Sequence, residues 1–206
     1  MEIINLEREQ KSAIEKVLVI LRQGGVIAFP TETSYGLGCD PRNLAALGKI
    51  YRIKSRATSK ALPLVACSME QVESIFDMPA KVRELTDKHW PGPLTVLLEP
   101  KDMRLRHALP VFKDGLAAVR ISSHPFVQSL VCSYGFPLTA TSANASDEEA
   151  CYSVQEILKA FESQDVSKQP DLIIDGGALP ESEPSTIVKV NADGNVEIVR
   201  QGAIQL

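Results

Sequence analysis

The sequence predicts an α/β fold, because short apolar segments typical of buried strands alternate with segments whose apolar residues repeat at helical spacing. The chain has 206 residues, of which 44% are hydrophobic, and this is enough for one substantial core. We therefore expect a single domain over residues 1–206, built on one large mixed sheet. Residues 191–195 have the composition of a hairpin turn, so the strands on either side should be antiparallel.

The first helix is expected to begin at a capping box, Ser12 to Glu15, and to end at Gly24. The strand after it, residues 26–29, is bounded by glycine and proline and is typical of a strand buried on both faces. Further strands are expected at residues 62–66, 94–98, 116–119, 137–140, 172–174, 186–190 and 196–199. Further helices are expected at residues 44–52, 69–75, 80–89, 126–132 and 154–161.

Composition excludes several classes of protein. No apolar stretch approaches the roughly 20 residues that cross a bilayer, and a secretory signal pattern is missing, so we expect a cytoplasmic location. A formal net charge of −4 argues against a surface that binds nucleic acid through many phosphate contacts. The cysteines lack metal-binding spacing, and in such a chain we expect reduced, partly buried thiols at Cys39, Cys67, Cys132 and Cys151.

Two segments combine polar side chains with the expected ends of strands, where open α/β sheets bind ligands. Residues 30–38 offer hydroxyl groups and two glycines, although a strand-to-helix turn has the same composition. Residues 139–146 are rich in small polar groups, and Ser142 and Asn144 can donate hydrogen bonds to phosphate or sugar oxygens. The alternative for this second segment is a turn or a helix cap.

Four cationic residues are candidates for binding an anion. Lys54 and Arg56 lie two residues apart, so their side chains converge if the chain is extended there, and together they suit a polyphosphate. The alternative is a solvated basic helix end. Arg120 and Arg200 each end an apolar segment and can meet an anion at the strand end or form a structural ion pair.

Common catalytic signatures are absent from the sequence. The chain contains neither a phosphate-binding Gly-x-x-x-x-Gly-Lys-Ser/Thr loop nor a Gly-x-Gly-x-x-Gly fingerprint. His89, His107 and His124 show no spacing that suggests a metal site or a hydrolase triad. If a nucleotide binds, it must bind in another way.

Seven ordered blocks between about residues 10 and 203 resemble the YrdC/Sua5 family, in its single-domain bacterial type. The blocks are Pro30-Thr31-Glu32-Thr33 with Tyr35-Gly36-Leu37-Gly38, Lys54-x-Arg56, Trp90-Pro91-Gly92-Pro93 with Thr95, Val119-Arg120, Ser142-Ala143-Asn144, Pro184-Ser185-Thr186-Ile187 and Arg200-x-Gly202.

The resemblance implies a YrdC-like fold, a twisted and mostly mixed or parallel open sheet with flanking helices and a concave, positively charged cavity. It implies an L-threonylcarbamoyladenylate synthase, a nucleotidyltransferase that converts L-threonine, bicarbonate and ATP to threonylcarbamoyl-AMP and pyrophosphate. The product serves threonylcarbamoyladenosine modification at tRNA position 37, so transient contact with tRNA or the downstream transferase complex is expected. Magnesium would be carried by ATP, without a protein-bound metal site.

The resemblance also implies roles for individual residues. The catalytic set would be Lys54, Arg56, Ser142 and Asn144. The same four residues, with Lys60 and Arg200, would bind ATP. L-threonine would be bound by Thr31, Arg120 and Ser185.

Three positions depart from the family pattern. Ala57 and Ala61 replace prolines, and Asp147 replaces a glycine in a segment, residues 145–152, that is a candidate lid. Two alternatives stay open at this point. One is a non-catalytic module of the same fold that binds double-stranded RNA or tRNA, and the other is a diverged hydrolase or transferase with a different substrate.

Overall fold

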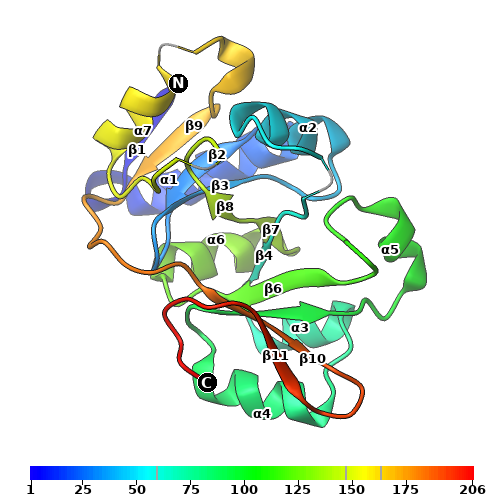
Figure 1. Ribbon diagram of the computed structural model, residues 1–206. Coiled ribbons are helices and arrows are strands. Elements are labelled where there is room, and N and C mark those ends of the chain that lie inside the picture. The colour runs from blue at the N-terminus through cyan, green and yellow to red at the C-terminus, as the bar shows by residue number, and fades with distance from the viewer. Residues whose placement is uncertain (59, 147, 163) are drawn as a thin grey trace.

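The computed structural model describes residues 1–58, 60–146, 148–162 and 164–206, and it confirms the α/β class. The strands form two mixed sheets, one of five and one of six strands, where the sequence suggested a single large sheet. Figure 1 shows the five-stranded sheet in the upper half of the molecule and the six-stranded sheet in the lower half. The expectation of a single domain stays a prediction.

The five-stranded sheet has a parallel part and an antiparallel part. Its strands, in spatial order, are β1 (Glu2–Asn5), β9 (Leu172–Asp175), β2 (Ile27–Pro30), β3 (Tyr35–Gly38) and β8 (Thr141–Ser142). β9 pairs in parallel with both β1 and β2, whereas β3 pairs antiparallel with β2 and β8. All four residues of β2 are buried, which confirms a strand buried on both faces.

The six-stranded sheet contains the C-terminal hairpin. Its strands, in spatial order, are β11 (Val196–Arg200), β10 (Thr186–Val190), β5 (Leu94–Leu98), β6 (Ala117–Ile121), β4 (Leu64–Ala66) and β7 (Leu138–Thr139). β10 and β11 pair antiparallel, which confirms the predicted hairpin. β10 joins β5 in parallel and places the hairpin beside the centre of the sheet.

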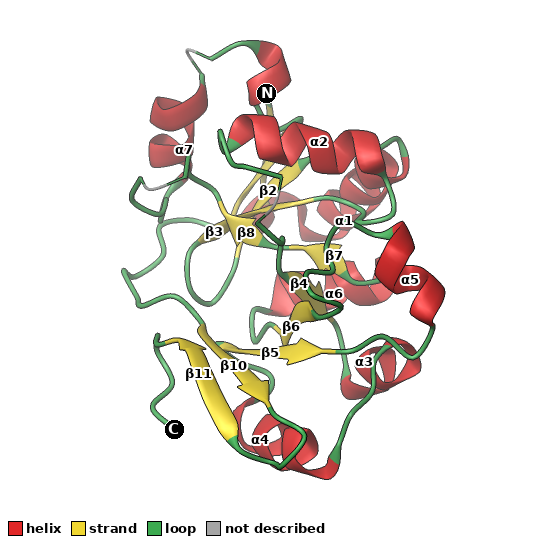
Figure 2. Cartoon of the chain, turned by 45° about the vertical axis from the view of Figure 1, so that its right-hand side comes forward, coloured by secondary structure: helices red, strands yellow, loops and turns green. Residues whose placement is uncertain are grey.

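Helices cover both sheets (Figures 1 and 2). The helical elements are α1 (Leu6–Arg22), α2 (Leu44–Ile53), α3 (Met69–Ile75), α4 (Ala80–His89), α5 (Met103–Ala108), α6 (Pro125–Tyr134), α7 (Val154–Phe161) and the 3-10 helix η1 (Val166–Lys168). α1, α2 and α7 lie beside the five-stranded sheet, and α3 and α4 lie beside the six-stranded sheet. Within the described residues, no helix combines the length and the apolar character needed to span a membrane. The cytoplasmic location stays a prediction.

The predicted start of the first helix is wrong. α1 begins at Leu6 and is capped by Asn5, whose side chain accepts a hydrogen bond from the backbone N–H of Glu7 (3.0 Å). Glu9 has non-helical backbone angles (φ −134°), so Ser12 follows an internal kink instead of opening the helix. The polar first turn hides the helical periodicity, and the pattern therefore becomes visible only after the kink.

Residues 30–38 form the turn and the second strand of a hairpin with β2, not the strand-to-helix turn that was the alternative interpretation. Thr31 organises its turn, because its hydroxyl donates to the Ser34 carbonyl oxygen (2.7 Å) and accepts from the Thr33 N–H (3.1 Å). Gly38 is needed for close packing, since a Cβ there would lie 2.6 Å from both the Phe29 ring and the carbonyl oxygen of residue 139.

The two sheets meet where the chain passes from one to the other. β7 pairs with β4 in the six-stranded sheet, and two residues later β8 pairs with β3 in the five-stranded sheet. Residues 176–185 make another crossing, from the end of β9 to the start of β10, which is visible in Figure 1. Polar segments from both sheets are thereby brought to one region between them.

The expectation of four reduced thiols is wrong for one pair. Cys67, just after β4, and Cys132 in α6 form a disulfide, with their Cα atoms 5.2 Å apart. Cys39 and Cys151 are free and buried. The sequence separation of 65 residues hid this contact, which depends on α6 packing beside β4.

Candidate functional site

A cavity of about 670 Å³ lies between the two sheets and is lined from both of them. The five-stranded sheet contributes residues of the β2–β3 turn and β8. The six-stranded sheet contributes residues of β5, β6, β10 and β11. Of the predicted site residues, the cavity wall includes Thr31, Arg56, Arg120, Ser142, Asn144, Ser185 and Arg200. Lys54 and Lys60 are not part of the wall.

Basic side chains outnumber acidic ones on the wall. The charged lining residues are Arg56, Lys113, Arg120, Lys189, Arg200, Asp114 and Glu148. Burial lowers the pKa of Arg200, and the positive charges of Arg120 and Arg56 lower it further. The three guanidinium groups thus act on one another across the same space, and a bound anion would relieve this repulsion.

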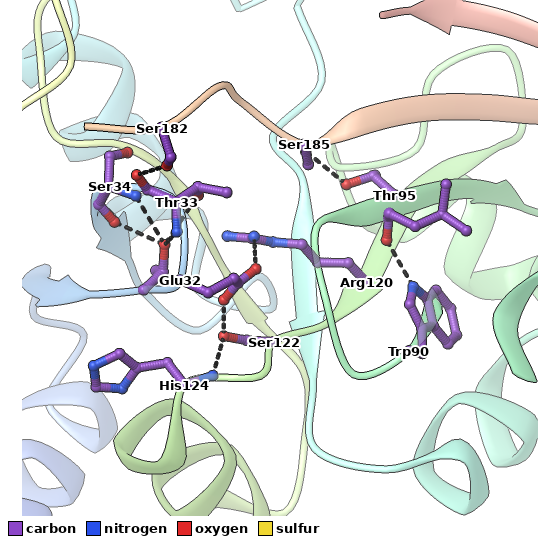
Figure 3. Close-up of polar contacts among 12 residues, drawn as sticks. Glu32, Thr33, Ser34, Trp90, Thr95, Arg120, Ser122, His124, Ser182 and Ser185 are labelled. Atoms are coloured by element: carbon purple, nitrogen blue, oxygen red, sulfur yellow. Dashed lines mark hydrogen bonds and ion pairs between the residues drawn. The ribbon is translucent and has the colours of Figure 1, made fainter. Parts of the chain in front are cut away.

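Arg120 is held by an ion pair with Glu32, as Figure 3 shows. Their side chains are 7% and 12% exposed, so the pair is largely buried. The second carboxylate oxygen of Glu32 accepts a hydrogen bond from the Ser122 hydroxyl, which in turn accepts from the backbone N–H of His124 (3.2 Å). Arg120 lines the cavity whereas Glu32 does not, so the carboxylate fixes the guanidinium from outside the wall.

Arg200 and Ser185 form a second polar group on the wall. Arg200 donates two hydrogen bonds to the Ser185 carbonyl oxygen, from Nε (3.1 Å) and Nη2 (2.6 Å), and Nη2 also lies 3.0 Å from the Ser185 hydroxyl. The Ser185 and Thr95 hydroxyls are 2.9 Å apart (Figure 3). Gly202 permits this arrangement, because a Cβ there would lie 2.1 Å from the carbonyl oxygen of residue 184.

Arg56 retains donors that can bind a ligand. Its Nη2 donates to the Ala61 carbonyl oxygen (3.1 Å), and its buried Nε has no hydrogen-bond partner among the described residues. A buried donor without a partner is costly, so a ligand that accepts from it would stabilise the site. Ala61 therefore touches the predicted anion site through its carbonyl group, whereas Ala57 is exposed.

The geometry expected of Lys54 and Arg56 is wrong. Lys54 is the C-cap of α2 with helical backbone angles, and Ser55 is left-handed (φ 47°), so the segment is not extended. Only Arg56 reaches the wall. Lys54 is 2% exposed and its ammonium donates to the Ser142 carbonyl oxygen (2.6 Å) and the Asn144 carbonyl oxygen (2.8 Å). Its direct contact with a nucleotide stays a prediction.

Other predicted roles also stay predictions. Lys60 is exposed, and its carbonyl group accepts a hydrogen bond from the Tyr51 hydroxyl (2.9 Å). Thr31 lies on the wall, but its hydroxyl already bonds within the β2–β3 turn. Asp147 lies outside the described residues, and with it part of the candidate lid at residues 145–152.

Sequence reasoning missed several polar residues of the wall, which are Thr33, Tyr35, Lys113, Tyr152, Ser182 and Lys189. Ser182 joins two of the chain segments, since its hydroxyl donates to the Thr33 carbonyl oxygen (2.7 Å) and its carbonyl oxygen accepts from the Tyr152 hydroxyl (3.1 Å). Thr33 and Tyr35 lie within a motif that the sequence already singled out. Tyr152 ends the candidate lid at residues 145–152, whereas Ser182 carries no local signal, because only the crossing of residues 176–185 brings it to the cavity.

Fold and site together define an α/β protein with a cavity between two mixed sheets, in whose wall arginines are the principal charged groups. More specifically, the chain belongs to the Sua5/YciO/YrdC family, whose model, described as telomere recombination, matches residues 19–202. A threonylcarbamoyl-AMP synthase of Vibrio vulnificus is 34% identical over 194 residues, which cover 93% of this chain and 99% of the relative. A threonylcarbamoyl-AMP synthase of Yersinia enterocolitica is 40% identical over 158 residues, covering 75% and 82%.

Solved structures show the same fold. The structure of P. abyssi Sua5 complexed with L-threonine has a TM-score of 0.83 at 29% identity and matches 98% of this chain. This chain spans only 58% of that longer protein. E. coli YciO has a TM-score of 0.82 at 28% identity, and the match covers 98% of this chain and 94% of YciO. These likenesses confirm the predicted family.

Proposed function

We propose that this chain is an L-threonylcarbamoyladenylate synthase, a nucleotidyltransferase that forms threonylcarbamoyl-AMP and pyrophosphate from L-threonine, bicarbonate and ATP. The observation that carries the proposal is the convergence of Arg56, Arg120 and Arg200 on one cavity between the sheets. Threonylcarbamoyl-AMP synthases match this chain over nearly their whole length. A related protein, P. abyssi Sua5, has been solved with L-threonine.

L-threonine would bind on the side of the cavity formed by β6 and the end of the 176–185 crossing. Arg120 is preorganised by Glu32 and can offer its free edge to the amino acid's carboxylate, the bidentate pairing that guanidinium groups favour. Ser185, beside Thr95, would bind the threonine hydroxyl or carboxylate. Thr31 would contribute through the turn it organises, since its own hydroxyl is engaged there.

ATP would bind across Arg56, Ser142, Asn144 and Arg200. Arg56 lies close enough to Arg200 to lower the pKa of Arg200, so the two arginines can bind neighbouring phosphates of one triphosphate. Ser142 at the end of β8 and Asn144 just after it add short polar groups that let the nucleotide approach the backbone. Lys54 and Lys60 would act from outside the wall.

The reaction needs positioning and charge stabilisation more than a covalent nucleophile. Threonine's amine condenses with bicarbonate to a carbamate as the C–N bond forms and water leaves, and a carbamate oxygen then forms a bond to the α-phosphorus of ATP. The bond from that phosphorus to the bridging oxygen breaks, and pyrophosphate leaves with the electron pair. Arg56 and Arg200 would stabilise the charge that develops on the phosphate oxygens.

We propose that Mg²⁺ arrives on the phosphate oxygens of ATP with water as its other ligands. The described residues contain no group of three or more His, Cys, Asp or Glu side chains that could hold a metal ion, so no protein site is assigned. The product is a reactive mixed anhydride, and we propose that a transferase that modifies adenosine at tRNA position 37 consumes it. Transient contact with tRNA or with that transferase complex follows from this proposal.

Pyrophosphate release by the purified protein tests the proposal. In bicarbonate buffer with Mg²⁺ and ATP, release should require L-threonine, and Arg120→Ala should abolish the response to threonine at sub-saturating concentrations. Release that ignores threonine and bicarbonate would rule out the synthase. Salt-dependent binding of double-stranded RNA without ATP turnover would instead support the non-catalytic module.

A further inference from the structure

Lys54 places a buried ammonium group behind the cavity wall. The residue is the C-cap of α2 and is 2% exposed. Its Nζ lies 2.6 Å from the Ser142 carbonyl oxygen, 2.8 Å from the Asn144 carbonyl oxygen and 3.2 Å from Asn144 Oδ1. An ammonium has three N–H donors, and these three oxygens satisfy all of them.

The backbone of Lys54 binds the same stretch of chain. The N–H of Ser146 donates to the Lys54 carbonyl oxygen (2.8 Å). We call residues 142–146 the wall segment. It is therefore tied to the end of α2 at both ends, and the Ala143 N–H donates to the Tyr35 carbonyl oxygen (2.8 Å), which ties its middle to β3.

The wall segment depends on a cation for its conformation. Two of its backbone carbonyl groups and one side-chain oxygen converge on the same point, where their partial negative charges would repel one another without a donor. The ammonium also fixes the Asn144 side chain, because Oδ1 accepts from Lys54 while Nδ2 donates to the Glu148 carbonyl oxygen (2.5 Å). The oxygen and the nitrogen of the Asn144 amide therefore each have a hydrogen-bond partner.

The two sides of the wall segment have different neighbours. Ser142 and Asn144 line the cavity on one side, and Lys54 lies on the other side without reaching the cavity. We propose that Lys54 is a positioning residue, which holds the wall segment so that Ser142 and Asn144 face the ligand. The nucleotide part of this inference rests on the proposed function, but the positioning of the segment does not.

Hydrogen–deuterium exchange of the ligand-free protein tests the positioning directly. Lys54→Met keeps the length of the side chain but removes its donors, and it should raise the exchange rate of the amides of Ala143, Asn144 and Ser146 at least tenfold. Lys49→Met is the matched control. Lys49 lies on the same helix but pairs with Asp171 (2.6 Å), away from the wall segment, so its loss should leave these amides unchanged.

Calorimetric titration with ATP completes the test. Lys54→Met should weaken ATP binding at least tenfold, Lys49→Met should not, and Lys54→Arg should restore exchange protection and part of the affinity because it keeps a buried cationic donor. Weakened ATP binding with unchanged exchange would mean a direct phosphate contact and would overturn the proposal. Increased exchange with unchanged ATP binding would also overturn it. If the wild-type protein fails to bind ATP, the proposed function fails, and the exchange rates alone decide whether Lys54 positions the segment.

Discussion

Glu32 and Arg120 form a largely buried ion pair that joins the two sheets of the molecule. Glu32 lies in the turn between β2 and β3 of the five-stranded sheet, and Arg120 lies on β6 of the six-stranded sheet. The Ser122 hydroxyl donates to the second carboxylate oxygen, so both oxygen atoms of the Glu32 carboxylate are held. The pair therefore sets the spacing of two cavity walls as well as the orientation of one guanidinium group.

We predict that Glu32→Ala lowers the free energy of unfolding by about 3 kcal/mol, because it leaves the Arg120 charge buried without its partner. Glu32→Gln should cost clearly less, since its amide oxygen still accepts from Arg120. Urea unfolding measures both. Glu84→Ala, which removes an exposed partner of Lys81 and Lys88, serves as the control and should have a much smaller effect. Equal losses for Glu32→Ala and Glu84→Ala would contradict a structural role for the buried pair.

Replacing Arg200 should separate charge from shape. Arg200→Lys keeps the positive charge but loses the pair of hydrogen bonds that Nε and Nη2 donate to the Ser185 carbonyl oxygen. The proposed synthase should therefore lose roughly 10-fold to 100-fold in kcat/KM. Arg200→Ala should lose more, about 10²-fold to 10³-fold, because the charge at the phosphates is also removed. Steady-state pyrophosphate release measures both values. A wild-type rate in the Arg200→Ala variant would contradict the proposed role of Arg200 in binding ATP.

The disulfide between Cys67 and Cys132 gives a prediction that needs no assumption about function. Closing a loop of 65 residues should stabilise the protein by about 2–4 kcal/mol, mainly by restricting the unfolded chain. Dithiothreitol should therefore lower the urea midpoint of the wild-type protein but not that of a Cys67→Ser/Cys132→Ser variant. Thiol labelling in denaturant without reductant should find only Cys39 and Cys151. Labelling of all four cysteines would contradict the disulfide and support the fully reduced protein expected from the sequence.

Burial lowers the pKa of Lys54 to about 8, from an ordinary value of 10.5. Between these values the unfolded chain binds the proton more tightly than the folded protein, so stability should rise as the pH increases from about 8. Relative to Lys54→Met, the wild-type protein should gain up to about 1.4 kcal/mol per pH unit in this window. Urea unfolding at pH 7.5, 8.5 and 9.5 measures the difference. Parallel profiles of stability against pH for the two proteins would contradict a lowered pKa of Lys54.

Elements with clear local signals were predicted well from the sequence. The bounds of α3, α4, α7, β5 and β10 agree with the structure. For α7 the reason is physical, since Ser153 caps the helix by accepting from the Glu156 N–H (3.3 Å) and Glu156 accepts from the Tyr152 N–H (2.5 Å). Local chemistry of this kind is visible in a single sequence.

Elements that depend on distant partners were missed. β3 contains Gly36 and Gly38, which favoured a turn, yet these glycines allow close contact with β8 and with Phe29. α5 carries no buried residue and so shows no apolar repeat. The division into two sheets was also missed. The chain passes from the six-stranded sheet to the five-stranded sheet between β7 and β8, and the apolar segment that predicted one strand at residues 137–140 does not reveal this change.

The site was predicted as separate motifs, and tertiary structure decides which of them meet. Arg56, Arg120 and Arg200 do share one cavity, although they are far apart in the sequence. Lys54 was paired with Arg56 from their spacing alone, but the left-handed Ser55 sends the two side chains to different sides of the wall. Backbone angles of this kind are not readable from residue types.

The most direct test of the central claim is to follow the carbon atom of bicarbonate. Purified protein should be incubated with ATP, Mg²⁺, L-threonine and ¹³C-bicarbonate, and the adenylates should be analysed at once by mass spectrometry. We predict a threonylcarbamoyl-AMP whose mass rises by one unit with the label and which disappears when threonine is omitted. Conversion of ATP to AMP and pyrophosphate without any labelled adenylate would contradict the proposed synthase.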